Sequence, residues 1–309
     1  MAISLITTVL NEEKTIKQFL NSVLKQTKRP DEFIIVDGGS KDKTYEILRE
    51  FGKKYGWIKA YLFNGALIGE GRNFGIKKSK CDIIAITDAG CFLDENWLKE
   101  ITKPFSENKH IDVVIGTYKP HSTNDFEYFQ GLVGSPDSGK IFMKPSRMST
   151  RSMAFKKTAW EKVGGFAKKL GGPFGGEDTQ FNMKLIENKS NFYFAQNAIV
   201  YWRMHKSFKK FASQFYRYAV GDRKSGNIFK LRKNLLFILG FWFYIVLILA
   251  ALFFNPIISA SLVIFPFFYL VGYGFKIAIK SGKPTGIFYG PVFLLIKRIA
   301  YVLGASVGK

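Results

Sequence analysis

Cysteine is scarce in this sequence: Cys81 and Cys91 are the only two among 309 residues. Two cysteines are too few for a disulfide framework, and their spacing is not that of a metal-binding finger. A disulfide-stapled secreted module is therefore excluded, and we expect a reducing compartment. We expect no secretory signal either, because Met1–Leu10 runs directly into the first predicted strand.

Acidic residues are also few. The chain has 24 of them against 46 basic residues, which gives a formal net charge of +22 at pH 7. This excess favours anionic partners: nucleic acid, the anionic face of a membrane, or phosphorylated substrates. Hydrophobic residues make up 47% of the chain and aromatic residues 16%. That composition is ample for a folded core and excludes a disordered chain.

Charge is missing altogether from residues 234–275. One membrane span needs roughly 20 apolar residues, so this length predicts two, a transmembrane hairpin over 233–275 that turns at Asn255–Pro256. Basic residues flank both outer ends of the hairpin and none lies at its turn: Lys230, Arg232, Lys233, Lys276, Lys280 and Lys283. Both outer ends, and hence the N-terminal part of the chain, are expected to face the cytoplasm of a multi-pass membrane protein.

Two further segments have the composition of helices at a membrane surface. Residues 286–296 are apolar but are followed by Lys297–Arg298, and a charge in mid-span costs roughly 2.5–3.5 kcal/mol. We predict a cytoplasmic loop and an interfacial helix over 276–309, with a third span as the alternative. Aromatic and basic residues also interleave over 208–223, which suits a helix on anionic lipid: Phe208, Lys209, Lys210, Phe211, Phe215, Arg217, Tyr218 and Arg223.

The N-terminal part alternates apolar strands with amphipathic helices. This alternation indicates a parallel sheet, and each predicted strand leads into a polar or glycine-rich turn. Strands are predicted at 3–9, 33–36, 58–63 and 83–86. Open α/β sheets bind ligands at the carboxyl edge of their strands. We therefore expect a nucleotide-binding half-domain over residues 1–115, with Gly69–Gly75 forming one of the turns at this edge.

The stretch Ile83–Cys91 is the centre of this half-domain. Its apolar run ends abruptly in Asp88 and a small-residue turn, which indicates a buried strand delivering a carboxylate to the ligand edge. The alternative is an aspartate that only caps a turn. We interpret Asp88 as the floor of an active site, because the neighbouring strands end in similar polar turns.

The segment from 116 to 232 is predicted to form an acceptor half, which includes the basic helix. Residues 116–149 show little periodicity and form either an excursion that shapes an acceptor pocket or a plain loop. A strand is predicted at 152–155 and a short helix at 158–163. The glycine-rich run before Glu177–Asp178 then places Asp178 at the head of a helix, as a helix cap, a catalytic acid or both.

Five motifs in this order resemble the inverting glycosyltransferases of family 2. They are Thr8-x-x-Asn11-Glu12, Val36-Asp37-Gly38-Gly39-Ser40, Gly71-Arg72-Asn73-x-Gly75, Asp88-Ala89-Gly90 and Glu177-Asp178. The resemblance covers roughly the first two thirds of the chain. It implies an α/β GT-A fold with a mostly parallel, Rossmann-like sheet over a catalytic domain of residues 1–232. The apolar hairpin over 233–275 and the segment 276–309 follow this domain.

The resemblance also implies roles for single residues. Thr8, Glu12, Asp37 and Arg72 would hold the nucleotide sugar, and Asp88 would meet the ribose and a metal-bound diphosphate. Asp178 would be the general base. Asp178 would only position an acceptor that is already ionised, such as a phosphate. The acceptor or the diphosphate would contact Glu177 and the Gln214-x-x-Arg217-Tyr218 element.

The sequence departs from the family at the expected metal site. Displacing a nucleoside diphosphate needs its charge neutralised, which suits Mg²⁺ or Mn²⁺ on oxygen ligands together with arginine. Gly90 stands where the second acid of the usual Asp-x-Asp would be. Asp88 is therefore the predicted metal ligand, and Asp94, Asp178 and His205 are candidates to complete the set.

These observations predict a membrane-anchored, metal-dependent, inverting glycosyltransferase. It would move a sugar from a nucleoside-diphosphate sugar to a lipid-linked acceptor at the cytoplasmic face, either a polyprenyl phosphate or a lipid-linked glycan. The loss of an acid at Gly90 motivates an alternative, a non-catalytic membrane scaffold that binds nucleotide sugars. The uncharged hairpin argues against a nucleic-acid partner.

Overall fold

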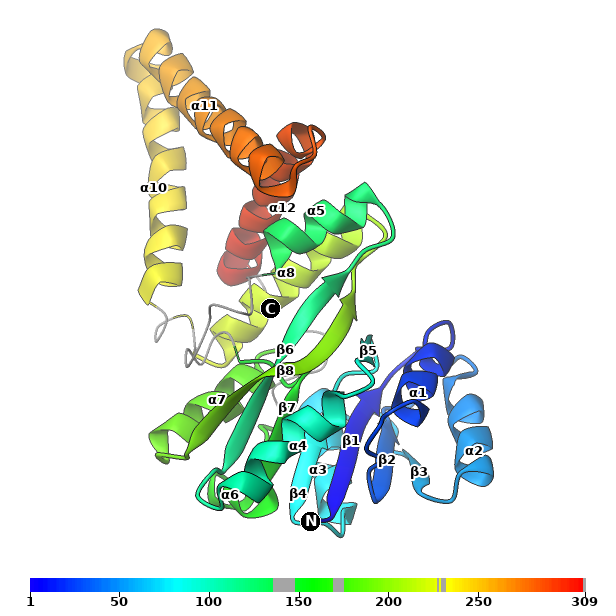
Figure 1. Ribbon diagram of the computed structural model, residues 1–309. Coiled ribbons are helices and arrows are strands. Elements are labelled where there is room, and N and C mark those ends of the chain that lie inside the picture. The colour runs from blue at the N-terminus through cyan, green and yellow to red at the C-terminus, as the bar shows by residue number, and fades with distance from the viewer. Residues whose placement is uncertain (136–147, 169–174, 227, 229–231, 308–309) are drawn as a thin grey trace. The chain divides into compact units, whose positions relative to one another are not determined.

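A computed structural model of the chain describes residues 1–135, 148–168, 175–226, 228 and 232–307 (Figure 1). The chain forms two compact units. The first consists of Met1–Pro120 and Asp137–Arg203, and the second of His121–Pro136 and Met204–Lys309.

Within the described residues the first unit is built on one sheet of eight strands, in the order β3-β2-β1-β4-β7-β6-β8-β5. The strands, in chain order, are β1 (Ile3–Val9), β2 (Glu32–Asp37), β3 (Ile58–Leu62), β4 (Ile83–Ile86), β5 (Cys91–Leu93), β6 (Val113–His121), β7 (Met153–Lys156) and β8 (Phe192–Arg203). Strands β1 to β4 pair in parallel, and β7 pairs antiparallel with both β4 and β6. The predicted α/β class with parallel N-terminal strands is confirmed.

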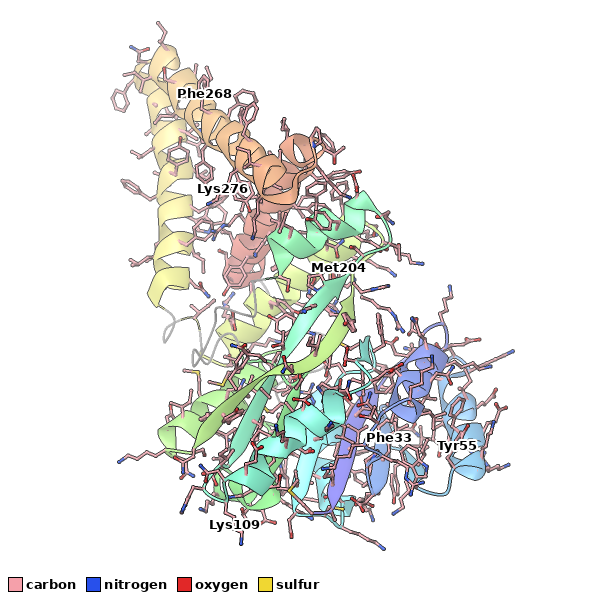
Figure 2. The ribbon with its side chains drawn as sticks, in the orientation of Figure 1. Phe33, Tyr55, Lys109, Met204, Phe268 and Lys276 are labelled. Atoms are coloured by element: carbon pink, nitrogen blue, oxygen red, sulfur yellow. The ribbon has the colours of Figure 1, made fainter. Side chains whose placement is uncertain are left out.

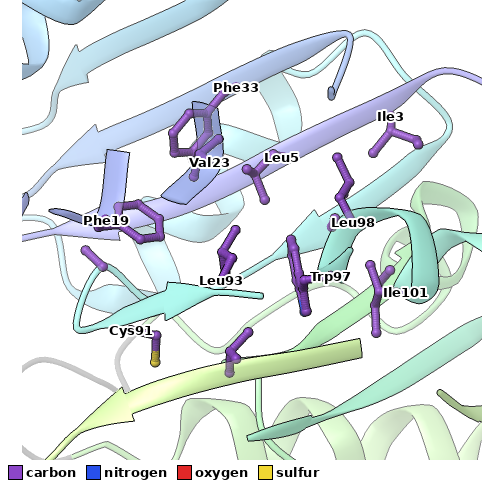
Figure 3. Close-up of a cluster of buried hydrophobic side chains, with 14 of the residues drawn as sticks. Ile3, Leu5, Phe19, Val23, Phe33, Cys91, Leu93, Trp97, Leu98 and Ile101 are labelled. Atoms are coloured by element: carbon purple, nitrogen blue, oxygen red, sulfur yellow. The ribbon is translucent and has the colours of Figure 1, made fainter. Parts of the chain in front are cut away.

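Alternate residues of β1 enter two separate hydrophobic clusters, because successive strand side chains point to opposite faces of a sheet. Ile3 and Leu5 belong to a cluster with residues of α1 (Ile16–Leu24), α2 (Thr44–Lys54) and α4 (Trp97–Glu107). Figure 3 shows part of it, including Leu5, Phe19 and Trp97. Ile6 belongs to the other cluster, with residues of α3 (Ile68–Lys78) and α7 (Glu177–Glu187). The sheet is thus covered on both faces.

The segment Gly69–Gly75, predicted as a turn, is part of the helix α3. Its glycines serve close packing instead. A Cβ at Gly71 would come within 2.8 Å of Thr8 Cγ2, and one at Gly75 within 2.9 Å of Ile6 Cγ2. Only a residue without a side chain lets the helix backbone lie this near to β1.

The excursion predicted over 116–149 contains regular structure. Strand β6 continues to His121, and α5 spans Asp125–Gly134. The side chain of Asn124 caps α5 by accepting a hydrogen bond from Glu127 N at 2.9 Å. Residues 136–147, the remainder of the excursion, lie outside the described residues.

The strand and helices predicted in the next segment are confirmed as β7, α6 (Lys157–Lys162) and α7. Helix α7 begins at Glu177, so Asp178 lies in its first turn, as predicted. The glycine-rich run before it falls partly on residues 169–174, which the structure does not describe.

The second unit holds α5 and the helices α8 (Phe208–Lys224), α10 (Arg232–Phe254), α11 (Pro256–Ser281) and α12 (Gly286–Val307). The two helices expected for the hairpin are present: α10 ends at Phe254, and Asn255 caps α11 through a 2.9 Å hydrogen bond from Ile257 N. That they cross a membrane stays a prediction. Apolar side chains of α10 and α11 face outward, and Figure 2 shows Phe268 projecting away from α11.

Within the described residues three helices are long and apolar enough to cross a membrane: Asn234–Phe254, Ile257–Ser281 and Gly286–Val307. The third is α12, which the sequence favoured as an interfacial helix while leaving a span open. Its Lys297 donates a hydrogen bond of 3.0 Å to the carbonyl oxygen of Val133, at the C-terminal end of α5. A charge in the middle of this helix is therefore partly satisfied by protein.

The prediction that the aromatic face of α8 lies on lipid is wrong for its central residues. Phe211 and Phe215 are buried, and they belong to one hydrophobic cluster with Phe129 of α5 and Phe293 of α12. The spacing of the aromatic residues along α8 correctly indicated an apolar helix face. The sequence alone does not distinguish lipid from protein as the partner of that face. The two compact units also do not follow the predicted divisions at residues 115 and 232. Helices α5 and α8 belong to the second unit because they pack with α12.

Candidate functional site

Polar residues converge at the carboxyl edge of the parallel strands. Val9 pairs with Asp37 across β1 and β2, and Ile6 pairs with Ile86 at the end of β4. Asp88 follows two residues later. The in-register parallel pairing therefore brings the turns after all three strands to one edge, as predicted.

Asp37 anchors the turn after β2 and leaves one buried acceptor. Its Oδ1 accepts hydrogen bonds from Gly39 N at 2.8 Å and Ser40 N at 2.7 Å. Gly39 has a φ of 101°, which favours glycine at this position. The carboxylate is fully buried, and Oδ2 has no partner among the described residues. A buried acceptor without a partner indicates a site for a water or a ligand donor.

The turns after β1 and β2 are tied to each other. Asn11 N donates to Ser40 Oγ at 2.8 Å, and Lys41 N donates to Asn11 Oδ1 at 2.8 Å. Glu12 N donates to Thr44 Oγ1 at 2.8 Å, and the Glu12 carboxylate accepts from the Thr15 hydroxyl. Asn11 and Glu12 are thereby held against the Asp37 turn.

Arg72 lies between two carboxylates at the centre of the edge. Its Nη2 is 2.8 Å from Asp88 Oδ1, its Nη1 is 2.9 Å from Glu177 Oε1, and its guanidinium lies 5.3 Å from the centre of the Phe166 ring. The side chain is only 3% exposed. It thus joins α3, α7 and the turn after β4 in one buried charge network.

Burial and charge act in opposite directions on this network. Burial lowers the pKa of Arg72, but Asp88 and Glu177 outweigh it and raise that pKa, so Arg72 stays protonated. Burial raises the pKa of the Glu177 carboxyl, Asp178 adds to the rise, and Arg72 opposes it. Asp178 is more exposed, and its Oδ1 accepts a 2.7 Å hydrogen bond from Thr179 N. The N-cap of α7 is Gly176, without a side-chain cap bond, so Asp178 does not cap the helix and its catalytic role stays a prediction.

Asp88 has a second arginine beside it that the sequence analysis missed. Arg151 Nε lies 3.8 Å from Asp88 Oδ2, and Asp88 is 32% exposed. The signal lay in the pairing of β7, since its antiparallel register places Met153 opposite Ile86 and thus Arg151 near Asp88. The sequence predicts the strand, but not that it runs beside β4 in the opposite direction.

Three of the remaining predicted site residues belong to the second unit. Gln214 and Arg217 lie on α8 in the second unit, where Gln214 Nε2 donates to the Tyr218 hydroxyl at 2.8 Å and Arg217 Nε donates to Ser213 O at 3.3 Å. His205 also belongs to the second unit. Asp94 accepts from its neighbour Asn96 N at 3.1 Å, within its own turn.

The residues at Asp88 fit a divalent ion that is shared with a bound diphosphate. The part of the chain that the structure describes has no group of three or more His, Cys, Asp or Glu side chains placed to hold a metal. Asp88 Oδ2 lies 3.8 Å from Arg151 Nε, and a side chain at Gly90 would meet nothing within 4 Å. One carboxylate suffices where phosphate oxygens and water complete the shell, as is common for Mg²⁺.

A mainly parallel sheet with a buried acceptor, an arginine–carboxylate network and one exposed aspartate at its carboxyl edge defines a nucleotide-sugar-binding α/β unit of the GT-A kind. The comparison with protein families agrees. Residues 4–166 match the model of glycosyl transferase family 2, and residues 121–275 match that of glycosyl transferase family group 2. The chain belongs to glycosyltransferase family 2.

Curated relatives carry the same class of name. The chain is 27% identical over 205 residues to glycosyltransferase AglE of Haloferax volcanii, which covers 64% of this chain and 65% of that protein. It is 29% identical over 133 residues to glycosyltransferase GlyG of Streptococcus pneumoniae, covering 43% and 44%. It thus aligns with less than two thirds of the length of either.

A relative in Methanococcus voltae is matched over more of its length. It is named a dolichyl N-acetyl-alpha-D-glucosaminyl phosphate diacetamido-dideoxy-glucuronosyltransferase, and it is 25% identical over 271 residues, or 80% of each chain.

Solved structures share the fold. The mannosyltransferase PcManGT of Pyrobaculum calidifontis, solved with GDP-Man and Mn²⁺, superposes with a TM-score of 0.67 over 97% of this chain and 86% of its own, at 15% identity. S. aureus TarS, solved with UDP-GlcNAc, gives 0.54 over 72% and 66%, at 21% identity.

Proposed function

We propose that this protein transfers a sugar from a nucleoside-diphosphate sugar to a lipid-linked acceptor at the cytoplasmic face of a membrane, with inversion. The observation that carries the proposal is the convergence of Asp37, Arg72 and Asp88 at one sheet edge, with Asp178 beside Glu177 of the same network. The three apolar helices, and the dolichyl N-acetyl-glucosaminyl phosphate in the name of the Methanococcus voltae relative, support a lipid-linked acceptor.

The donor's base and ribose would meet the turns after β1 and β2. The unpartnered Oδ2 of Asp37 is placed to accept a hydrogen bond from a nucleobase N–H, which would satisfy a buried acceptor. Thr8 and Glu12 flank the same edge. Thr8 has its methyl group against α3, and Glu12 is held by Thr15 and Thr44.

The diphosphate would lie at Asp88. Arg72 holds the Asp88 carboxylate through a buried 2.8 Å ion pair and so fixes its orientation. Arg72 was predicted to hold the nucleotide directly. Because both of its Nη groups contact carboxylates, we propose that it acts through Asp88 instead. A divalent ion, when bound, would neutralise charge on the departing diphosphate, and Asp88 is the residue that would hold it.

The acceptor would approach from the side of α7. Asp178 lies in the first turn of this helix and is more exposed than Glu177, so it is the carboxylate placed to take a proton from an acceptor hydroxyl. A phosphate acceptor arrives already ionised and needs no base. The role of Asp178 therefore depends on whether the acceptor is a polyprenyl phosphate or a lipid-linked glycan. Glu177, Gln214 and Arg217 remain proposed contacts of the acceptor or the diphosphate.

The test is sugar transfer by the full chain in detergent. A panel of nucleoside-diphosphate sugars is offered with Mg²⁺ or Mn²⁺ and with each acceptor class in turn. Transfer to an extractable lipid supports the proposal, and release of the sugar by mild acid identifies a polyprenyl phosphate product. Donor binding without turnover on any acceptor would favour the non-catalytic scaffold instead.

A further inference from the structure

The second arginine at the sheet edge has no role in the proposal above. Arg151 comes just before β7, whose antiparallel pairing with β4 matches Ile86 to Met153. Continuing that register places Arg151 opposite Asp88. Its Nε is 3.8 Å from Asp88 Oδ2, which is an ion-pair distance but too long for a hydrogen bond.

Aromatic rings and a serine hold the guanidinium of Arg151. It lies 4.3 Å from the centre of the Trp202 ring and 5.7 Å from that of Tyr118, and Nη1 donates to Ser149 Oγ at 3.0 Å. A guanidinium stacked on a ring keeps the N–H groups of its edge directed outward, and it loses little freedom when those groups bind an anion. Arg151 is therefore already ordered next to Asp88.

The two arginines of the edge differ in what they offer a ligand. Arg72 is 3% exposed and contacts two carboxylates at 2.8 and 2.9 Å, so leaving them would expose buried charge. Arg151 is 19% exposed, and its contact with Asp88 is longer by about an ångström. Arg151 is therefore the arginine of this edge with exposed surface that an incoming phosphate can contact.

We propose that Arg151 binds the diphosphate of the donor and neutralises part of its charge as the sugar leaves. The inference rests on the proposed function. It follows from the chemistry of the turn, where Asp88 is followed by Ala89 and Gly90 and supplies a single acid. Because Asp88 is the one carboxylate of this turn that could bind a metal ion, the guanidinium of Arg151 would supply positive charge that the ion would otherwise provide alone.

The test separates binding of the diphosphate from binding of the nucleoside. Full-length protein in detergent is titrated with UDP and GDP by calorimetry, and with uridine and guanosine by ligand-observed NMR, each with EDTA and with Mn²⁺. Arg151→Gln should weaken binding of the nucleoside diphosphate about tenfold or more, most clearly in EDTA, and leave nucleoside binding unchanged. Arg151→Lys should recover part of the loss, because it keeps the charge but not the paired N–H groups.

The matched control is a second arginine-to-glutamine variant, at a position away from the site. Arg49→Gln makes the same charge change on an exposed face of α2 and should bind like the parent. Equal diphosphate affinity in Arg151→Gln and the parent, or equal losses of diphosphate and nucleoside binding, would overturn this inference. If the parent itself bound no nucleoside diphosphate, the proposed function would fall first.

Discussion

At the scale of single residues, the two exposed acids of the site should fail in different ways. Asp178→Asn should keep donor affinity and lose transfer to a hydroxyl acceptor by roughly 10²–10⁴-fold, because it removes a base without touching the diphosphate. Asp88→Asn should lower metal-dependent donor affinity as well as turnover. Calorimetry with and without metal, alongside single-turnover transfer, makes the comparison.

The reverse pattern would show that the roles of Asp88 and Asp178 are exchanged. That result would be loss of donor binding in Asp178→Asn and an intact metal dependence in Asp88→Asn.

Glu177 should leave a signature in the pH dependence of stability. Burial raises the pKa of this carboxyl above its ordinary value, so the folded protein holds its proton to higher pH than the unfolded chain. Between the unfolded and folded pKa values the folded state binds more protons, and stability therefore falls as pH rises through that window. Glu177→Gln removes this term. The difference in melting temperature between variant and parent should shift in favour of the variant from pH 4 upward, as thermal unfolding in detergent would show.

If the difference in melting temperature between Glu177→Gln and the parent did not change with pH, that result would contradict the raised pKa of Glu177. Asp112→Asn is a suitable control, because it makes the same carboxylate-to-amide change outside the network: Asp112 Oδ1 lies 3.4 Å from Lys156 Nζ.

Single residues also mark what the sequence could reveal about the site. Asp88 and Asp178 were predicted because one follows a strand and the other begins a helix, and such positions are visible as breaks in hydrophobic periodicity. The roles of Asp37 and Arg72 came from the family resemblance. Arg151 was missed because its place depends on β7 running antiparallel beside β4. That pairing joins residues far apart in the chain, and local patterns do not encode it.

At the scale of elements, the closeness of α3 to the sheet sets how Arg72 reaches its carboxylates. Gly71→Ala should destabilise the protein by about 1–3 kcal/mol, since the added Cβ would lie 2.8 Å from Thr8 Cγ2 and force the helix outward. Donor affinity should fall with it. Gly56→Ala is the control, because its Cβ would meet nothing within 4 Å. Denaturation of both variants in detergent tests the prediction. If Gly71→Ala were as stable as the parent, α3 could move away from β1 without loss of stability.

Two helical segments, residues 69–75 and α5, were not predicted from the sequence. Glycines in 69–75 suggested a turn, because glycine is common in turns, yet here it permits close helix packing. Helix α5 was not predicted, although Phe126, Phe129 and Val133 recur at helical spacing. The segment is short and its partners lie far along the chain, so its apolar face has no local explanation.

At the scale of the whole molecule, the orientation in the membrane is the main expectation. Basic residues flank the outer ends of the hairpin, so Asn255 should be extracytoplasmic and Lys280 cytoplasmic. Asn255→Cys should react with an impermeant maleimide added outside cells, and Lys280→Cys should react only after permeabilisation. The native thiols should not interfere, because both are buried and burial raises the pKa of Cys91 to about 12.

Labelling of position 280 from outside, with 255 protected, would invert the predicted topology. It would also place the sheet unit on the opposite side from the nucleotide-sugar pool that the proposed function requires.

The place of α5 in the chain has a consequence for synthesis. Helix α5 is made between β6 and β7, but the helices it packs with, α8 and α12, come later, and α12 lies more than 150 residues further along. Chains emerge from the ribosome in order, and segments fold as their partners become available. The sheet can close once β8 has emerged, while the apolar side of α5 must wait for α8 and α12. The newborn chain therefore carries an exposed hydrophobic surface on α5 until α12 has been made, long after the strands on either side of α5 have found their partners.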